Sequence, residues 1–314
     1  MTSSRALAPY GETVRDRMRV IVTGATGLIG RHLAAALIAR GDETVLLSRE
    51  PRTVAGTATV PWDAVGEPLD AALLDGVGAI INLAGEPIGA GRWTDARRRR
   101  ILGSRLTVTR RCVEALRQGG PRVLVNASAI GYYGSTEAPV TESSPPGTDF
   151  LATTCARWEE AAIRGEDVAR VVRVRTGLVL ARDGGVFPRL LQVARLGASG
   201  PLGSGRQWLS WIHIDDEVAA LLAAIDDNSI RGPVNAVAPA PVRQREFAQA
   251  LARLVRRPSF LPAPASAIRL ALGEMAALAL SGQQVLPEVL DARGTMWHFS
   301  SLEAALTNLL EVQG

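Results

Sequence analysis

One short segment near the start of the chain constrains its fold more than any other feature. The apolar run at 19–23 enters a turn with glycines at 24, 27 and 30, and an amphipathic helix is expected from Leu28. The start of such a helix presents unpaired N–H groups and a positive dipole end, which suits phosphate groups. Gly24 allows the tight turn, Gly27 lets phosphates approach the backbone, and Gly30 lets helix and strand pack closely. The unit predicts a dinucleotide site with contacts from Gly24, Thr26, Gly27, Leu28 and Ile29.

Beyond this unit, short apolar runs continue to alternate with longer helical periods. Strands are predicted at Arg19–Thr23, Glu43–Leu47, Ala79–Asn82, Arg122–Asn126 and Val171–Arg175. Helices are predicted at Leu28–Arg40 and Asp95–Arg117, and Asp149 is expected to cap a third. This alternation indicates β-α-β units whose parallel sheet is covered by helices on both faces. The predicted fold class is therefore α/β, a doubly wound parallel sheet of the Rossmann type.

The C-terminal part has a different character. A Pro-rich stretch at 260–264 precedes predicted helices at 265–280, 287–292 and 301–310, with no long strands between them. Residues 1–17 lack hydrophobic periodicity and are predicted to be a disordered extension. We expect a dinucleotide-binding domain at 18–240, of which 179–211 contributes to the substrate side, and a smaller, mainly helical domain at 241–314.

Composition excludes several classes of protein. Hydrophobic residues make up 47% and charged residues 21%, the balance of a globular chain rather than a disordered one. Apolar runs such as 33–39 are far shorter than the roughly twenty residues of a membrane-spanning helix, so no membrane association is predicted. Two cysteines cannot build a disulfide scaffold or a four-thiolate metal site. They suit a reducing compartment, and we expect a cytoplasmic protein without a metal.

Basic residues are all arginine, because the sequence contains no lysine. Mechanisms that need a lysine ammonium or a Schiff base are therefore excluded. The run Arg97–Arg100 is predicted to be the solvated face of a helix. It has no interleaved aromatic residues, so nucleic acid is not an expected partner.

The end of the second predicted strand bears on the choice of cofactor. NAD sites usually place an acidic residue about 20 residues after the glycine turn, on the ribose hydroxyls. Here the strand ends in Ser48 and Arg49, which could hold a 2′-phosphate, with Arg31 as a second cation. This pattern favours NADP (NADPH) over NAD. Asp63, after the expected third strand, lies where an adenine contact is expected.

Several motifs together resemble a known family. The glycine turn, Asn82-Leu-Ala-Gly, and Ser128 with Gly131-Tyr-Tyr-Gly are similar to the extended short-chain dehydrogenase/reductases of the NAD-dependent epimerase/dehydratase superfamily. Arg92-Trp-Thr, Trp158-Glu and the stretch 202–212 resemble an atypical subgroup, described as nucleoside-diphosphate-sugar epimerase-like or cell-division-inhibitor-like. Residues 272–287 resemble its C-terminal domain of unknown function. The resemblance extends over nearly all of 18–310.

The resemblance assigns roles to individual positions. It implies that Leu83, Ala84 and Gly85 line the adenosine side of the cofactor. Ser128 matches the active-site serine, whose hydroxyl bonds a substrate carbonyl. Gly177 follows the sixth strand, where the backbone meets the nicotinamide amide. A strand-end turn serine is the alternative for Ser128.

One departure from the family pattern affects the chemistry. The superfamily uses a Tyr-x-x-x-Lys pair, in which the lysine lowers the tyrosine pKa for proton exchange during hydride transfer. The matching positions here are Cys155 and Glu159. A carboxylate one helical turn away disfavours a thiolate, so Cys155 is expected to be a poor base, and packing is its leading interpretation. Glu159 could act as the acid or base if burial raised its pKa. Tyr133, or its neighbour Tyr132, could instead act as the proton donor.

Two functions remain open from the sequence. One is an NADP-dependent oxidoreductase or epimerase-like enzyme with a non-standard acid/base group and a small-molecule substrate, for which a nucleotide-sugar is one option. The other is an NADP-binding regulatory or redox-sensing protein with little or no turnover. A homodimer is compatible with either. The missing Tyr/Lys pair is the main argument for the second.

Overall fold

A seven-stranded parallel sheet forms the centre of the molecule. The computed structural model describes residues 17–311. The strand order is β13-β8-β7-β6-β1-β2-β5, and every neighbouring pair is parallel. The strands are β1 (Arg19–Thr23), β2 (Glu43–Ser48), β5 (Val60–Pro61), β6 (Val77–Asn82), β7 (Val123–Ala129), β8 (Arg170–Thr176) and β13 (Gly232–Ala236). The strand order changes direction between β1 and β6, and this switch point is where open α/β sheets bind their ligands.

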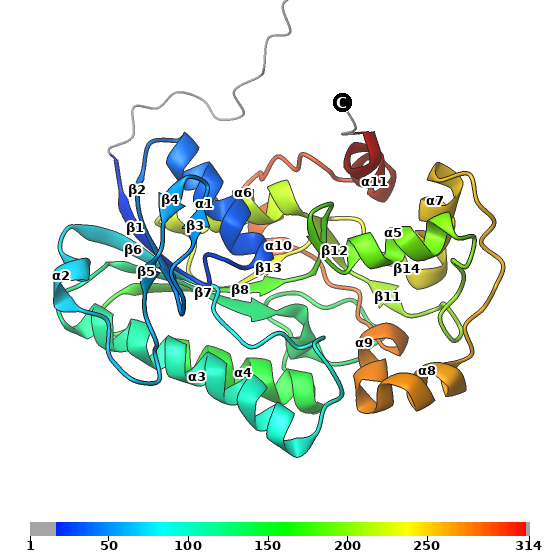
Figure 1. The fold of residues 1–314 in the computed structure, drawn as a ribbon, viewed down its shortest axis with the longest axis horizontal. Helices are drawn as coiled ribbons and strands as arrows, with labels where there is room; N and C mark the ends of the chain where they lie inside the picture. Colours follow the sequence, from blue (N-terminus) through cyan, green and yellow to red (C-terminus); the bar gives the residue numbers. More distant parts are fainter. Residues whose placement is uncertain (1–16, 312–314) are drawn as a thin grey trace, which may run out of the picture.

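Helices cover both faces of the sheet (Figure 1). Helices α1 (Leu28–Ala39) and α6 (Ile214–Asp226) lie on one face, and α3 (Asp95–Arg117) and α4 (Phe150–Ile163) lie on the other. Successive side chains of a strand point to opposite faces of the sheet, so two hydrophobic cores form, one beneath each layer of helices. Val20 and Val22 of β1 pack toward the α1 side, whereas Ile21 between them packs toward the α3 side. The predicted doubly wound α/β class is confirmed.

Smaller elements surround the carboxyl end of the sheet. A three-stranded sheet contains β10 (Gly184–Gly185), β9 (Leu178–Ala181) and β12 (Trp211–His213), and β11 (Trp208–Leu209) pairs with β14 (Val242–Arg243). A hairpin joins β3 (Thr53–Val54) to β4 (Thr57–Ala58), and a 3-10 turn, η1, covers Ile130–Tyr133. The remaining helices before residue 260 are α2 (Ala71–Leu74), α5 (Phe187–Arg195) and α7 (Gln244–Leu254).

The C-terminal region is mainly helical, as predicted, but its first helix is interrupted. Helix α8 (Ala265–Leu272) ends at Gly273, which adopts φ +59°, and a 3-10 turn η2 (Gly273–Ala276) and α9 (Ala277–Leu280) follow. The prediction of one continuous helix over 265–280 is therefore wrong. A left-handed glycine ends an α-helix because it turns the chain away from the helical path. Helices α10 (Glu288–Asp291) and α11 (Leu302–Glu311) complete the chain.

The C-terminal region also packs back on the sheet and on the segment around β9. Helix α10 packs beside β13, and Val140 forms an isolated parallel bridge with Val285. Helix α11 contributes Leu306 and Leu309 to a core that contains Phe187 and Trp211. The domain boundaries given above stay a prediction. The expected extension at 1–17 lies, except for its last residue, outside the described residues.

The expected capping of the third helix is present. The Asp149 carboxylate accepts a hydrogen bond from the Ala152 N–H at 2.9 Å, and α4 begins at Phe150. Strands β7 and β8 run three and one residues further than expected, to Ala129 and Thr176. Within 17–311, no helix combines the length and the hydropathy that crossing a membrane requires.

Candidate functional site: two pockets at the carboxyl edge of the sheet

The glycine turn packs tightly against the loop that follows β6. Gly24 has φ +69°, and a Cβ there would lie 2.8 Å from the Leu83 carbonyl carbon. A Cβ on Gly30 would lie 2.3 Å from the Gly24 oxygen. A side chain at either position would collide with backbone atoms, so only glycine fits there without moving the chain. Helix α1 then starts at Leu28 with no acidic residue in its first turn. Its first N–H groups have no intrahelical acceptor and are available to an anion.

A pocket of about 380 Å³ lies over this turn. It brings together nine of the twelve residues predicted to bind the cofactor: Gly24, Thr26, Gly27, Ser48, Arg49, Asp63, Leu83, Ala84 and Gly85. They come from the ends of β1, β2, β5 and β6. Leu28 and Ile29 start the helix but do not line the pocket, and Leu28 instead approaches Gly184 and Gly185. Gly177 lines a second pocket.

Of the two arginines expected near the 2′-phosphate, only one lies at this pocket. Arg49 is exposed at the rim, and in the described part of the chain its guanidinium has no ion pair or hydrogen bond. The Ser48 hydroxyl donates to the Glu50 carbonyl and also bonds the Thr59 hydroxyl at 2.7 Å. Arg31 does not line the pocket, because its Nη1 pairs with Asp183 at 2.9 Å. Arg49 thus offers a free cation for a phosphate at this rim.

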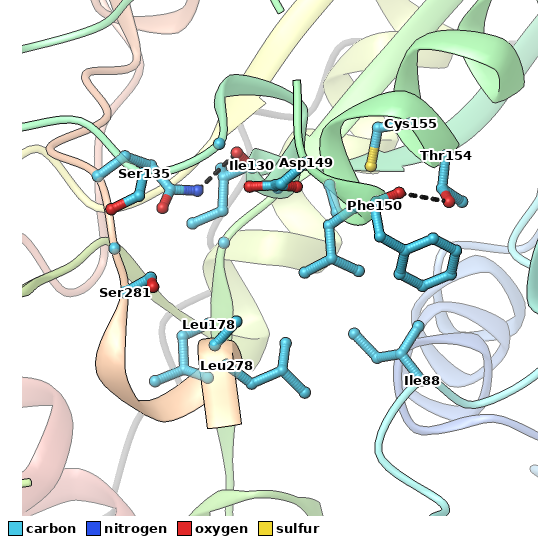
Figure 2. Close-up of a pocket in the computed structure, with 18 of the residues that line it drawn as sticks. Ile88, Ile130, Ser135, Asp149, Phe150, Thr154, Cys155, Leu178, Leu278 and Ser281 are labelled. Atoms are coloured by element: carbon cyan, nitrogen blue, oxygen red, sulfur yellow. Dashed lines mark hydrogen bonds between the residues drawn. The ribbon is translucent and has the colours of Figure 1, made fainter. Parts of the chain in front are cut away.

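The second pocket, of about 510 Å³, lies at the carboxyl ends of β7 and β8. Figure 2 shows Cys155, Thr154 and Phe150 on α4, with Phe150 near Ile88 and Leu178 near Leu278. Its walls combine α3, α4, η1, β8, β9, β11 and the C-terminal segment η2–α9. The lining is mostly apolar. A compact molecule with a large apolar part would therefore fit this space.

Three predicted catalytic residues meet in a buried polar network. The Ser128 hydroxyl donates to Glu159 Oε1 at 2.7 Å. Arg175 donates to the same carboxylate through Nε at 2.8 Å and Nη2 at 2.9 Å. Its Nη1 donates to the Tyr133 hydroxyl at 2.9 Å, and that hydroxyl donates to Asn235 at 2.6 Å. Ser128, Glu159 and Tyr133 do not line the 510 Å³ pocket, so their catalytic roles stay predictions.

Arg175 sets the charge balance of this network. Burial lowers its pKa, but the hydrogen bonds and charge of Glu159 outweigh that effect and raise it. Arg173 Nε lies 3.6 Å from Glu159 Oε2 and adds a second cation. Burial raises the pKa of Tyr133 to about 12, although Arg175 opposes the shift. The carboxylate is thus engaged in ion pairs, and the phenol is a weak acid held in a structural position.

Cys155 lines the second pocket, but its thiol is poorly suited to proton transfer. Burial is the main effect that raises its pKa to about 12, and the Glu159 charge adds to it, opposed by Arg105. The side chain is 5% exposed. A thiol in this environment remains protonated near neutral pH. The predicted increase in the Cys155 pKa agrees with this geometry, and burial contributes more than the carboxylate.

Sequence reasoning missed several polar residues of the site. Arg98 and Arg105 line the second pocket from one face of α3, and Arg98 pairs with Glu274 of the C-terminal segment. Their spacing of seven residues along a helix could have placed both on one face. Only part of the 97–100 run is solvated, since Arg97 pairs with Glu86 at 2.6 Å. Arg175 was also predictable, because a charged residue in a central strand needs a buried partner.

Comparisons with known proteins agree with this architecture. Residues 20–236 match the NAD dependent epimerase/dehydratase family, and residues 263–309 match a domain of unknown function, DUF1731. The chloroplastic epimerase family protein SDR39U1 homolog of Arabidopsis thaliana is 38% identical, over 94% of this chain and 88% of the relative.

Two solved structures are similar over 94% of this chain. Human epimerase family protein SDR39U1, solved with NADPH, has a TM-score of 0.86 and 36% identity, covering 94% of this chain and 100% of the human one. A nucleoside-diphosphate sugar epimerase from Corynebacterium glutamicum has a TM-score of 0.78 and 32% identity, covering 94% of this chain and 58% of that chain. With the geometry of the glycine turn, these matches establish that the chain belongs to the NAD-dependent epimerase/dehydratase family.

Proposed function

We propose that this protein binds NADPH across its two pockets and transfers hydride to or from a small-molecule substrate in the 510 Å³ pocket. One observation carries the proposal. The 380 Å³ pocket is formed by the glycine turn, and the 510 Å³ pocket contains Gly177 and Leu178 at the opposite side of the same sheet edge. A dinucleotide that starts at the glycine turn would reach the second pocket with its far end, so a substrate space adjoins the reactive group.

The residues present fit this cofactor. Gly24, Gly27 and the start of α1 would hold the pyrophosphate, Asp63 and Leu83–Gly85 the adenosine, and Arg49 the 2′-phosphate. Support comes from the unpaired Arg49 guanidinium and from the human relative that was solved with NADPH. Bound NADPH supplies the hydride. NAD is the disfavoured alternative, because no carboxylate follows β2 directly.

Proton transfer in this site cannot follow the Tyr/Lys pattern. Cys155 stays protonated, and Tyr133 and Ser128 donate their protons to Asn235 and Glu159 within the protein. Proton transfer from a positioned acid typically contributes about 10² to 10⁴ in rate. We therefore propose that hydride transfer to generic carbonyls or sugar nucleotides is slower than in Tyr/Lys enzymes by about that factor.

Arg49→Ala should weaken NADPH binding by about 10- to 150-fold, because a hydrogen bond to a charged group contributes roughly 1.5–3 kcal/mol. NADH affinity should change little, since NADH has no 2′-phosphate. Titration of both nucleotides against both proteins measures this difference. Arg52→Ala is the control, because Arg52 is a nearby exposed arginine outside the pocket. Equal losses for NADPH and NADH would contradict the phosphate role.

Cys155→Ala should leave any measured turnover nearly unchanged, because the thiol is a protonated packing residue. Steady-state rates with NADPH and a panel of carbonyl compounds test this expectation. Ser128→Ala should lower turnover if substrate carbonyls bind that hydroxyl. Loss of a robust activity in Cys155→Ala would instead identify the thiol as the acid and refute the packing interpretation.

A regulatory or redox-sensing role with little turnover is the second candidate. The observation that favours it is the engagement of Ser128, Glu159 and Tyr133 in bonds to one another or to Arg175 and Asn235. NADPH binding without turnover on the panel would support it. The proposal includes a small-molecule partner, for which a nucleotide-sugar is one option. A homodimer is compatible with both candidate functions. A cytoplasmic location rests on two free, buried thiols.

A further inference from the structure

Arg105 is a cation without a carboxylate partner at the wall of the 510 Å³ pocket. It projects from the middle of α3 and lines the pocket together with Cys155 and Trp158. The guanidinium carbon lies 4.9 Å from the centroid of the Trp158 ring. Among residues 17–311 no acidic side chain lies within ion-pair distance of it. Burial lowers its pKa, and the charge of Glu86 opposes that change.

The orientation of Arg105 leaves one edge of its guanidinium unused. Nη1 donates to the carbonyl oxygens of Glu86 and Ile101, both at 3.0 Å. Within residues 17–311 Arg105 donates hydrogen bonds through Nη1 alone, so its Nε and Nη2 are unpaired there. A Cβ on Gly85 would lie 3.2 Å from the Arg105 Cζ, so the backbone of that loop also fixes the side chain. Two N–H groups in a fixed plane match the two oxygens of a carboxylate.

Other charges at the pocket wall are already compensated. Glu274 forms an ion pair with Arg98. Asp149 caps α4 through its Oδ1, and Cys155 is neutral. The two arginines and two carboxylates of the lining balance formally, but neither carboxylate lies within ion-pair distance of Arg105. A half-buried cation without a close counter-charge is costly, and an anionic ligand beside it would reduce that cost.

The remaining lining limits the class of ligand. It is dominated by Ile88, Trp93, Phe150, Leu151, Leu178 and Leu278. These side chains offer apolar and aromatic contact but no further free cation. A diphosphate, with at least two charges, would have only the Arg105 fork to neutralise it. A single carboxylate on an apolar skeleton matches both the one free fork and the apolar walls.

We propose that the 510 Å³ pocket selects compact apolar or aromatic carboxylates, whose carboxylate pairs with Nε and Nη2 of Arg105. The inference rests on the proposed function, because it names the substrate class of that same site. Arg105 is a binding and specificity residue in this arrangement. It is distinct from Arg49, which serves the other pocket.

Calorimetric titration of two acids and their primary amides tests the proposal. The probes are 3-phenylpropionate and octanoate with 3-phenylpropionamide and octanamide, added to the full chain with and without saturating NADP⁺. We expect each acid to bind at least tenfold more tightly than its amide. In Arg105→Gln the acids should lose about 10- to 150-fold in affinity and the amides little. Arg105→Lys, which keeps the charge but not the fork, should recover part of the loss.

Control measurements distinguish failure of this inference from failure of the proposed function. Arg110→Gln, on the same helix but exposed and outside both pockets, should bind all four probes as the wild type does. NADPH affinity should be unchanged in Arg105→Gln, and an equal loss for NADPH would show that the cation serves the cofactor and overturn the proposal. Acid and amide binding equally to the wild type would overturn it too. Failure of the wild type to bind NADPH would refute the proposed function, while the acid–amide comparison without NADP⁺ still decides this inference.

Discussion

Replacing Arg175 with Met should lower the free energy of unfolding by about 3–5 kcal/mol, the typical effect of removing one partner of a buried ion pair. The side chains of Arg175 and Glu159 are 3% and 5% exposed, and the carboxylate receives two of its hydrogen bonds from this guanidinium. Without it, Glu159 keeps the Ser128 hydroxyl and the more distant Arg173 Nε at 3.6 Å. Chemical denaturation of both proteins measures the difference.

A second pair of variants distinguishes lost pairing from lost volume. Glu159→Met combined with Arg175→Met should recover much of the loss, because replacing both partners leaves no uncompensated charge. Arg117→Met removes an exposed ion pair with Asp167 and should cost about 0–1 kcal/mol. If Arg175→Met does not fold, Arg175→Lys keeps the charge and still reports on the loss of the two-pronged contact. A cost below about 1 kcal/mol for Arg175→Met would refute this account of the pair.

Glu217→Gln should stabilise the protein at pH 8.5 by roughly 3–5 kcal/mol and leave it nearly unchanged at pH 4.5, since one pKa unit corresponds to about 1.4 kcal/mol. Glu217 is fully buried on α6, and Oε1 accepts a hydrogen bond from the Thr176 hydroxyl at 2.8 Å, whereas Oε2 has no hydrogen-bond partner among residues 17–311. Burial raises the pKa of its carboxyl from 4.5 to about 8, and the Thr176 bond only partly opposes the shift. The folded protein thus keeps this proton where the unfolded chain has lost it.

The direction of the pH effect follows from proton counting. Between pH 4.5 and about 8 the folded state binds more protons than the unfolded state at this site, so stability falls as pH rises. Glutamine removes that dependence because it carries no titrating proton. Denaturation midpoints at several pH values give the difference between variant and wild type, which cancels the other titrating groups. Glu303→Gln, at an exposed site on α11, is the control and should show no such trend. Parallel curves for Glu217→Gln and wild type would contradict the assignment.

Local sequence patterns were sufficient for the fold and for most of the lining of the 380 Å³ pocket. The glycine turn, strand ends and capping Asp149 depend on residues close in sequence, so periodicity and spacing predict them. Nine of the twelve predicted cofactor residues line one pocket for the same reason. Each lies at the end of a parallel strand or in the loop that follows it.

The state of the charged residues at the second pocket could not be predicted from local sequence patterns. Its charge balance depends on which acid each arginine reaches across the fold, as when Arg98 pairs with Glu274. Arg31 was expected at the cofactor and instead pairs with Asp183, which no spacing rule indicates. Engagement of Ser128 by Glu159 is likewise a tertiary contact over 31 positions. Residue type identified the candidate site residues. Whether each of them can bind a ligand or transfer a proton depends on its burial and on its partners from distant parts of the sequence.

The C-terminal segment that walls the second pocket has a consequence for biosynthesis. Arg92 donates to the Leu270 carbonyl at 2.8 Å, 178 positions along the chain, and Gln283 donates to the Ile130 carbonyl, 153 positions back. A chain emerging N-terminus first can fold the glycine turn and its neighbouring strands early, because β1, β2, β5 and β6 all lie within residues 19–82. The C-terminal wall of the 510 Å³ pocket forms only after residues 274–283 have been synthesised. A nascent chain therefore forms the 380 Å³ pocket before the 510 Å³ pocket, and under the proposed function bound NADPH would stabilise it while synthesis continues.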